Sequence, residues 1–424
     1  MKILFATGKL NCVLSATHKI VYQIALQLQS QGHNCHICGF ATDTKETVSC
    51  DEGLTVHRWN SPLPWDKAQL AFDCYVQSVG VNERENARRK YMYTHPLKSA
   101  LLAYRYSPYA KPDKRAQLFA QRVKKLVQKE KFDAVIPVYM PFHEAMAVAD
   151  ALEGTVPLCA YQADPWGLHR DPKWAKDEAE HILQECQLFR KADHVITTPV
   201  LERMYREHPS YAPYADKLTA LNFPNIRKAP QSDAQCVFDF DKNDVNILFC
   251  GLLEDGYRSP QQFLLTAEKL MEKGLPLKIH FLGTSTSKAL ESFCRKYPDR
   301  IVHHQAVSFD RAVATMKKAD ILLNISNNLD NQVPSKIFDY FSLGKAVINV
   351  QKIENCPSRE YFDRYPLAYT ICDYAPDVDG LGKFVTEAKG KTIDFETVRE
   401  LFYDATIEYA ADVTEKILAG IVEL

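Results

Sequence analysis

The sequence lacks four features that would each define a class of protein: a long apolar run, a strong net charge, a secretion signal and a regular cysteine framework. No apolar run approaches the roughly 18–20 residues that cross a bilayer. The first ten residues are too short and too polar for a signal peptide. A net charge of −1 gives no overall field that favours nucleic acid. We therefore expect a cytoplasmic globular protein.

The sequence also lacks paired metal-binding motifs. Its twelve cysteines are scattered, which is typical of reduced thiols rather than of a disulfide scaffold. Cys35 and Cys38 have the spacing of metal ligands, with His33 close by, but no second pair of comparable spacing occurs. Because the segment follows Gly32 as an apolar strand would, we favour a buried strand over a zinc site. The acidic pair in 239–241 precedes a strand and is interpreted as linker. No metal site is predicted.

What is present is an alternation of strands and helices in a chain long enough for two domains of about 200 residues each. A strand at 2–7, a helix at 15–31 and a strand at 33–40 form a βαβ opening, which predicts a parallel sheet. Further apolar strands are expected at 132–139, 156–162, 192–198, 245–251, 277–283, 301–307, 319–326 and 346–350. The fold class is therefore α/β.

The most informative stretch runs from 319 to 350. We predict a strand, a polar loop, a short helix and a second strand, at 319–326, 327–333, 334–343 and 346–350. Ser335 would cap the helix and Gly344 would end it. The free N–H groups at the helix start, with Lys336 beside them, suit a phosphate. Asp339 would lean back over the same spot and could bind hydroxyl groups. A phosphate beside a hydroxyl-rich group indicates a nucleotide sugar.

The run from Ala319 to Ile348 resembles the donor-site segment of glycosyltransferase family 4. The resemblance implies the GT-B fold, in which two Rossmann-like domains face each other across a cleft, and a retaining enzyme. Members have two glutamates eight positions apart, and this chain has Asn331 and Asp339 there. By resemblance, Asp339 binds the ribose diol and Asn331 lies near the donor sugar. The donor would be a nucleotide diphosphate sugar, with no other cofactor.

The resemblance also implies which residues bind the diphosphate. The family has an arginine directly after the glycine that ends the first strand of the second domain, and a lysine seven residues after that glycine. Here Leu252 follows Gly251, and Arg258 stands at the lysine position. A departing diphosphate needs cations aimed at it, so we assign Arg258 to this role. Lys336 could compensate for the missing arginine.

Other donor contacts are expected at three strand ends. Thr284 offers a hydroxyl and a backbone N–H after the strand at 277–283. By resemblance, Val307 would place its backbone near the nucleobase. Gly8, in the turn after the first strand, would substitute for the paired glycines that the family often has near the donor phosphates, where this chain has Ser15 and Ala16.

The acceptor side is assigned to the first domain. Asp164 follows the strand at 156–162, and ligands gather at the carboxyl ends of such strands. By resemblance, the turn after this strand faces the acceptor, so Asp164 is the candidate residue, with His143 behind it. Each can also be interpreted as a helix cap or a packed side chain.

We place the domains at 1–224, on the acceptor side, and 225–393, which binds the nucleotide sugar. A hinge at 222–226 separates them, and a helix at 394–424 packs back on the first domain. Residues 84–131 form an insertion with fourteen Lys or Arg against three acids, interleaved with tyrosines. This composition suits an anionic membrane surface as well as it suits a solvated helical face. Nucleic acid is less favoured because no binding motif accompanies the basic residues.

We therefore expect the chain to transfer a sugar from a nucleotide diphosphate sugar to an acceptor hydroxyl, in polysaccharide or glycolipid assembly, either in the cytoplasm or at the inner face of the cell membrane. Leu252 and Asn331 leave open an accessory subunit of the same fold that binds without chemistry. A nucleotide-sugar epimerase or hydrolase of this fold is a second alternative.

Overall fold

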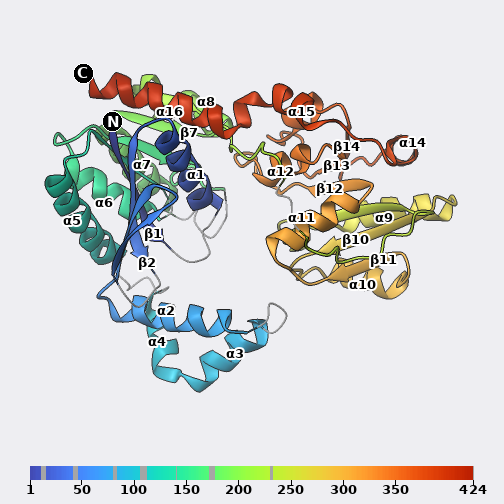
Figure 1. Cartoon of the computed structure of the whole chain (residues 1–424). Coiled ribbons are helices and arrows are strands. Elements are labelled where there is room, and N and C mark those ends of the chain that lie inside the picture. The colour runs from blue at the N-terminus through green and yellow to red at the C-terminus, as the bar shows by residue number, and fades with distance from the viewer. Residues whose placement is uncertain are drawn as a thin grey trace. The chain divides into compact units, whose positions relative to one another are not determined.

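The computed structural model describes residues 1–10, 16–41, 46–79, 84–105, 112–139, 141–170, 177–229 and 233–423. The chain divides into two compact units, shown in Figure 1. Unit 1 comprises Met1–Pro224 and Ile407–Leu424, and unit 2 comprises Asn225–Thr406. The predicted helix start at Ser15, residues 106–111 of the basic insertion and residues 230–232 of the linker lie outside the described residues.

Unit 1 contains a sheet in the order β3-β4-β2-β1-β5, in which β3 is antiparallel to β4 and the other pairs are parallel. Its strands are β1 (Lys2–Leu10), β2 (Asn34–Ala41), β3 (Thr47–Asp51), β4 (Leu54–Trp59) and β5 (Ala134–Pro137). A second parallel sheet follows, with β6 (Cys159–Gln162), β7 (His194–Thr197) and β8 (Leu218–Ala220). Two parallel bridges, Val135 to Leu158 and Val138 to Tyr161, join the sheets. The predicted βαβ opening is confirmed.

Cys35 and Cys38 are both buried in β2, as the strand interpretation predicts. Burial raises the pKa of the Cys35 thiol to about 12 and raises that of Cys38 as well. Both thiols are therefore neutral side chains packed within the strand. Among the described residues, no group of three or more His, Cys, Asp or Glu side chains could hold a metal ion.

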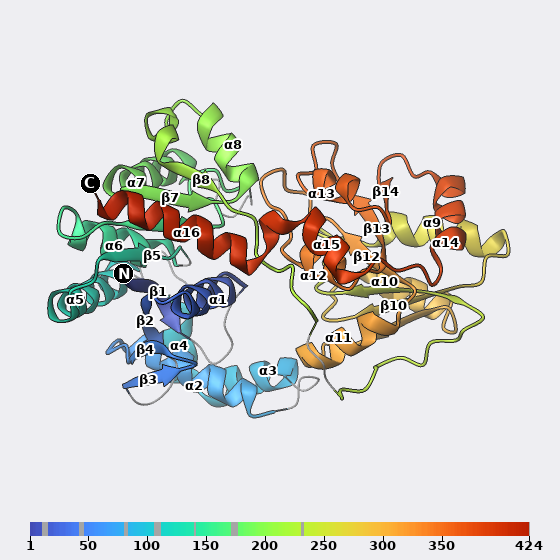
Figure 2. The same cartoon turned by 45° about the horizontal axis from the view of Figure 1, so that its top comes forward.

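The helices of unit 1 come from both ends of the chain. Around its sheets lie α1 (Ala16–Ser30), α5 (Pro112–Glu130), α6 (Phe142–Leu152), α7 (Glu178–Lys191), α8 (Pro199–Glu207), the 3-10 helix η3 (Ala212–Lys217) and α16 (Ile407–Val422). Helix α16 packs beside α1 (Figure 2). Its Ala411 and Leu418 join the core that Ile24 of α1 forms with the sheet.

A small helical group stands apart from the sheet within unit 1 (Figure 1). It consists of α2 (Pro64–Gln77), α3 (Arg84–Thr94) and α4 (Pro96–Arg105), which contact one another. Tyr91 is buried at its centre, edge-on to Phe72 and stacked on His95. The described part of the predicted insertion therefore separates into α3 and α4, which join α2 in this group, and α5, which packs on α6 and the sheet.

Unit 2 is built on a parallel sheet in the order β11-β10-β9-β12-β13-β14. Its strands are β9 (Val245–Cys250), β10 (Leu277–Leu282), β11 (Ile301–His304), β12 (Ile321–Ile325), β13 (Ala346–Gln351) and β14 (Ala368–Cys372). Its helices are α9 (Gln261–Glu272), α10 (Lys288–Lys296), α11 (Phe309–Lys318), α12 (Lys336–Ser342), α13 (Arg359–Arg364), α14 (Val378–Ala388) and α15 (Phe395–Leu401), with the 3-10 helix η4 (Tyr403–Ala405). This strand order is that of a Rossmann fold.

Among the predicted boundaries that differ from the structure, three concern segments with an assigned role. Strand β1 does not end at Thr7 but passes through Gly8 to Leu10, because a register shift after Ala6 lets it pair again with β2. Strand β11 ends at His304, which leaves Val307 in the following loop. The segment 394–424 holds two helices rather than one, α15 and α16, with η4 between them. No helix among the described residues is both long and apolar enough to span a membrane.

Candidate active site

The candidate functional region of unit 2 lies where β9 and β12 are neighbours, because the connections from these strands leave in opposite directions there. Ligands of doubly wound sheets bind beyond the carboxyl ends of the strands at this point. Gly251 follows β9 and Gly283 follows β10. A Cβ atom on Gly283 would lie 2.0 Å from the carbonyl oxygen of Gly251, so no larger residue fits. Because both residues are glycines, this edge of the sheet presents main-chain atoms rather than side chains.

Helix α12 is fixed to the end of β9 by two hydrogen bonds to one atom. Lys336 Nζ donates to the carbonyl oxygen of Cys250 at 3.2 Å, and the Tyr340 hydroxyl donates to the same oxygen at 3.1 Å. The Tyr340 hydroxyl also accepts from the Cys250 N–H at 3.2 Å. These contacts hold the first turn of α12, and with it Asp339, beside the end of β9.

The start of α12 differs from the prediction. Ser335 stands at the N-cap, but its backbone is already helical and its side chain makes no capping hydrogen bond. Its carbonyl accepts from Asn225 Nδ2 at 3.3 Å, and Ser342 Oγ donates to the Asn225 carbonyl at 3.2 Å. Asn225 therefore ties the start and the end of α12 to the segment before it, but it does not replace the predicted serine cap. Gly344 ends the helix as predicted, with φ +63°.

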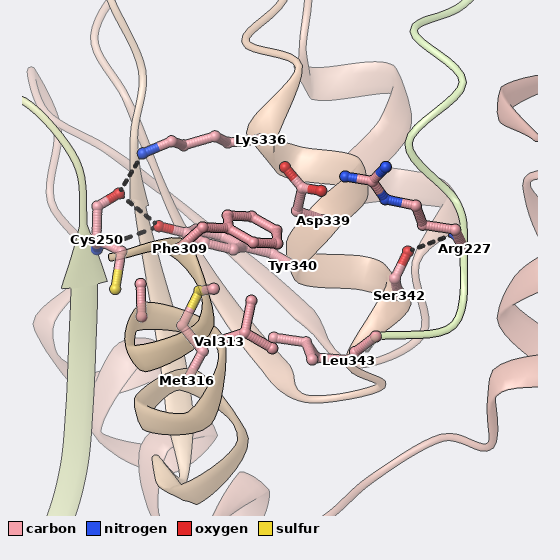
Figure 3. A pocket seen from close by; sticks show the side chains of 12 residues that line it. Arg227, Cys250, Phe309, Val313, Met316, Lys336, Asp339, Tyr340, Ser342 and Leu343 are labelled. Atoms are coloured by element: carbon pink, nitrogen blue, oxygen red, sulfur yellow. Dashed lines mark hydrogen bonds between the residues drawn. The ribbon is translucent and has the colours of Figure 1, made fainter. Parts of the chain in front are cut away.

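A pocket opens between α11 and α12 beside the end of β9 (Figure 3). Helix α11 gives it an apolar wall that includes Phe309, Val313 and Met316. Opposite this wall, the Asp339 carboxylate lies between Lys336 and Arg227 (Figure 3). One apolar wall facing one charged wall suits a ligand with a flat or apolar part and a polar part.

Besides Arg227, two cations stand close together at this site, Lys336, which lines the pocket, and Arg258. Partial withdrawal of the ammonium group from water lowers the pKa of Lys336, and the positive charge of nearby Arg258 lowers it further. The side chain of Lys336 as a whole is still exposed. Burial likewise lowers the pKa of Arg258. Its Nε is buried and has no hydrogen-bond partner among the described residues. An anion beside both cations would stabilise their charged forms.

The loop that carries Arg258 is held by the neighbouring strand ends. Lys352, just after β13, donates from Nζ to the carbonyl of Ser259 at 3.2 Å. Asn327, just after β12, donates from Nδ2 to the hydroxyl of Tyr257 at 3.0 Å. Arg258 is therefore fixed on both sides along the chain, which preorganises its guanidinium for an anion.

The other predicted donor residues are less closely tied to the pocket. Leu252 is 47% exposed. Thr284 is exposed, and its carbonyl accepts from the Leu253 N–H at 3.0 Å. Val307 lies in the loop before α11, and Asn331 is buried in the loop before α12. Among the described residues, neither Val307 nor Asn331 lines the pocket.

Asp164 and His143 both lie at the carboxyl edge of the sheets of unit 1, on the turn after β6 and at the start of α6. The His143 ring meets the Trp166 ring edge-on, with centroids 5.2 Å apart. Trp166 in turn stacks on Phe142 at 4.8 Å. Burial raises the pKa of the Asp164 carboxyl to about 6. Asp164 can therefore exchange a proton near neutral pH, which is a property of acid–base groups.

Neither protein-family models nor curated protein sequences match the chain. Solved structures do match it over nearly full length. Sucrose-phosphate synthase from Thermosynechococcus elongatus is 12% identical with a TM-score of 0.59, over 100% of this chain and 98% of that one. A UDP-forming α,α-trehalose-phosphate synthase from Burkholderia xenovorans, in complex with glucose 6-phosphate, is 8% identical with a TM-score of 0.59, over 99% and 100%. WaaG, a glycosyltransferase involved in lipopolysaccharide biosynthesis, is 12% identical with a TM-score of 0.53, over 97% and 95%.

The chain has the GT-B fold. The predicted fold class is thereby confirmed, with a Rossmann-like sheet in each unit. At 8–12% identity, the similarity to these enzymes concerns the fold alone.

In the first unit of this GT-B chain, the edge next to Gly8 is occupied by protein. Arg115 of α5 donates to the Gly8 carbonyl at 3.1 Å and forms ion pairs with Asp66, at 3.1 Å, and with Glu144. A Cβ on Gly8 would lie 3.0 Å from Glu144 Cβ. Gly8 therefore has a packing role here, whatever else it contacts.

Sequence reasoning missed Arg227, Phe309 and Arg115. A weak signal existed for two of them. Arg227 directly follows the hinge-like segment 222–226, and Phe309 follows the strand end where the nucleobase was expected. Arg115 gave no signal, because it was one of fourteen basic residues in the insertion and only the fold shows that it is buried.

Proposed function

We propose that this GT-B protein transfers a sugar from a nucleotide diphosphate sugar to an acceptor hydroxyl, and that the pocket of unit 2 binds the donor. The observation that carries the proposal is the placement of Asp339, Lys336 and Arg258 around the end of β9. A carboxylate can accept hydrogen bonds from both ribose hydroxyls, and two cations can bind the diphosphate. The apolar wall of α11 would contact the nucleoside.

The same groups account for catalysis. As the glycosidic bond breaks, negative charge develops on the departing diphosphate, and preorganised cations stabilise it. Lys336 supplies, from α12, the second positive charge that Leu252 cannot supply. Asp164 of unit 1 would contact the acceptor hydroxyl, with His143 behind it. The family resemblance favours retention of the anomeric configuration without a protein nucleophile, so that catalysis rests on positioning and leaving-group stabilisation.

The test combines binding with turnover. A panel of nucleoside diphosphates and nucleotide sugars is screened by thermal shift, since a ligand at 100 times its dissociation constant adds about 2.7 kcal/mol of stability. Ligands that stabilise the protein are then offered with sugar and lipid-linked acceptors, and products are identified by mass spectrometry. If no nucleotide in the panel stabilises the protein, the proposal is contradicted.

A catalytically silent accessory subunit is the second candidate, and the exposed Leu252 in place of the family's arginine favours it. Such a subunit would bind a nucleotide sugar without product in any acceptor assay. An epimerase or hydrolase of this fold would instead change the nucleotide sugar when no acceptor is added. The product analysis above therefore separates all three functions.

We also propose that the protein meets an anionic membrane through the α3–α4 face, which would suit a lipid-linked acceptor and glycolipid or polysaccharide assembly. This face consists of the exposed residues Arg88, Arg89, Lys90, Tyr93, Leu97 and Lys98. Tyr93 is 88% exposed and Leu97 is 83% exposed, between basic side chains. Apolar and aromatic groups amid Lys and Arg suit the headgroup region of an anionic bilayer.

A further inference from the structure

The carboxylate of Glu185 is the most thoroughly buried charged group of unit 1 that the proposed chemistry does not use. It projects from α7 and has no exposed surface. Oε1 accepts from the Trp166 N–H at 2.6 Å and from the Tyr205 hydroxyl at 2.9 Å. Oε2 accepts from the Gly167 N–H at 3.0 Å and from the Tyr211 hydroxyl.

A fifth donor, Gln162 Nε2 at the end of β6, also reaches Oε1 of Glu185. All five partners donate, so the arrangement satisfies the ionised carboxylate. Burial raises the pKa of Glu185, while the hydrogen bonds from Tyr211 and from the two main-chain amides lower it. A buried charge is costly unless it is fully paired, and apolar residues of similar size often stabilise a core as well. General stability therefore does not explain a carboxylate here.

What these bonds hold is the turn after β6. Two of the five donors are consecutive main-chain N–H groups, those of Trp166 and Gly167. On the other side of the turn, the Tyr139 hydroxyl donates to the Pro165 carbonyl at 3.4 Å. Gly167 packs directly on α7, because a Cβ there would lie 2.7 Å from Ile182 Cα. The turn that is fixed in this way is the one that carries Asp164.

We propose that Glu185 is a positioning residue for sugar transfer: it clamps the turn at 163–167 so that the Asp164 carboxyl stays at the carboxyl edge of the sheet. The role in transfer rests on the function proposed above, whereas the clamping of Asp164 does not. Without the clamp, the two amides lose their acceptor, the turn relaxes and Asp164 becomes hydrated. A displacement of about 1 Å at a reacting group can cost about a hundredfold in rate.

The test uses Glu185→Gln in the full chain, with Glu178→Gln as the matched control, since Glu178 is exposed on the same helix. Carbon-13 NMR of labelled aspartate follows the titration of Asp164. In the wild type, Asp164 should titrate at about pH 6. In Glu185→Gln it should titrate about one unit lower, towards the ordinary value of a hydrated carboxyl, and in Glu178→Gln it should not move.

Kinetics supply the second measurement. Glu185→Gln should lower kcat about ten- to a hundredfold and leave the KM for the donor unchanged, because the donor pocket lies in unit 2. If Glu185→Gln does not fold, Glu185→Asp keeps the charge but withdraws it from the two amides, and it should shift Asp164 in the same direction. Unchanged titration of Asp164 in the variant that folds would overturn the proposal. If the wild type transfers no sugar, the proposed function is overturned instead. The titration of Asp164 still tests whether Glu185 holds the turn in place.

Discussion

Lys336 and Tyr340, one turn apart on α12, donate to the same carbonyl oxygen, that of Cys250 at the end of β9. The two contacts have different consequences. Tyr340 is buried and its phenol stays neutral, because burial raises its pKa. Its bond is therefore a permanent link between strand and helix. Lys336 donates from a flexible, charged side chain that can turn to a ligand while Tyr340 keeps the helix in place.

Tyr340→Phe should therefore reduce stability without changing the charges of the pocket. The variant leaves the buried Cys250 N–H without its hydroxyl acceptor, while the Cys250 carbonyl keeps only Lys336, a loss of about 1–3 kcal/mol. The loss of stability is measured by urea denaturation, from the transition in which unit 2 unfolds. Tyr93→Phe, at a tyrosine that is 88% exposed, is the control and should unfold as the wild type does.

Asp339→Ala should weaken nucleoside diphosphate binding by about ten- to a hundredfold. Charge-assisted hydrogen bonds to the ribose hydroxyls contribute about 1.5–3 kcal/mol, and each 1.4 kcal/mol is tenfold in affinity. Calorimetric titration measures the change, with the exposed Asp299→Ala as control. The wild type should also prefer ribose over 2′-deoxyribose nucleotides. Equal affinity for both forms would mean that the diol is not bound at Asp339.

Arg258→Ala should lower turnover by about a hundredfold or more, as the loss of a preorganised donor does elsewhere. Lys336→Ala should have a comparable effect if the two cations share the diphosphate. Because both cations would contact the same diphosphate, the fold decrease in turnover of the double variant should be smaller than the product of the two single decreases. Arg295→Ala, an exposed arginine on α10, should leave the rate unchanged. A near-normal rate for Arg258→Ala would assign the diphosphate to other residues.

The titration of Asp164 should make stability depend on pH. Its pKa is raised by burial to about 6, from the usual 3.8. The folded state therefore holds this proton more tightly than the unfolded state, and stability falls as pH rises from about 4 through 6. With 1.36 kcal/mol for each pKa unit, the cost above pH 7 is at most about 3 kcal/mol. Asp164→Asn should accordingly melt at a higher temperature than the wild type at pH 8, with little difference at pH 4, while turnover falls. Equal melting temperatures at pH 8 would contradict the raised pKa.

Replacing Arg88, Arg89 and Lys90 by glutamine should weaken binding to anionic vesicles by up to about a hundredfold, since each basic residue near such a surface contributes about 1 kcal/mol. Sedimentation with phosphatidylserine vesicles at low salt measures this effect. Glutamine at Lys124, Lys125 and Lys129 removes three charges from α5 and is the matched control. Wild-type protein that does not sediment with these vesicles would contradict the membrane proposal. Donor binding should be unchanged in both variants.

The sequence predicted best the elements whose residues are buried on both faces. The strands at 245–251, 277–283 and 346–350 were recognised because a central parallel strand is apolar throughout, whatever its neighbours. The hairpin of β3 and β4 was missed because it is short, half exposed and rich in polar residues. Its turn, with Glu52 at φ 51° and Gly53 at φ 87°, does leave a signal in the Asp-Glu-Gly sequence.

The site was predicted only in its local part. Asp339 and Lys336 could be assigned from the sequence around them, because a short helix after a buried strand sets their direction. The apolar wall of Phe309, Val313 and Met316 could not, since it depends on how α11 packs beside α12. The same holds for Glu185, whose five partners come from β6, the turn after it, α8 and the segment before η3.

Helix α16 belongs to unit 1 but follows unit 2 in the chain. During synthesis, unit 2 can therefore be complete while the first 224 residues still lack one of their helices. Until α16 emerges, the face of α1 that it covers stays bare, and exposed apolar surface on an unfinished domain promotes aggregation. Unit 1 should thus finish folding last although most of it is translated first. A stop codon near 406 would therefore damage unit 1, although it leaves the whole of unit 2 translated.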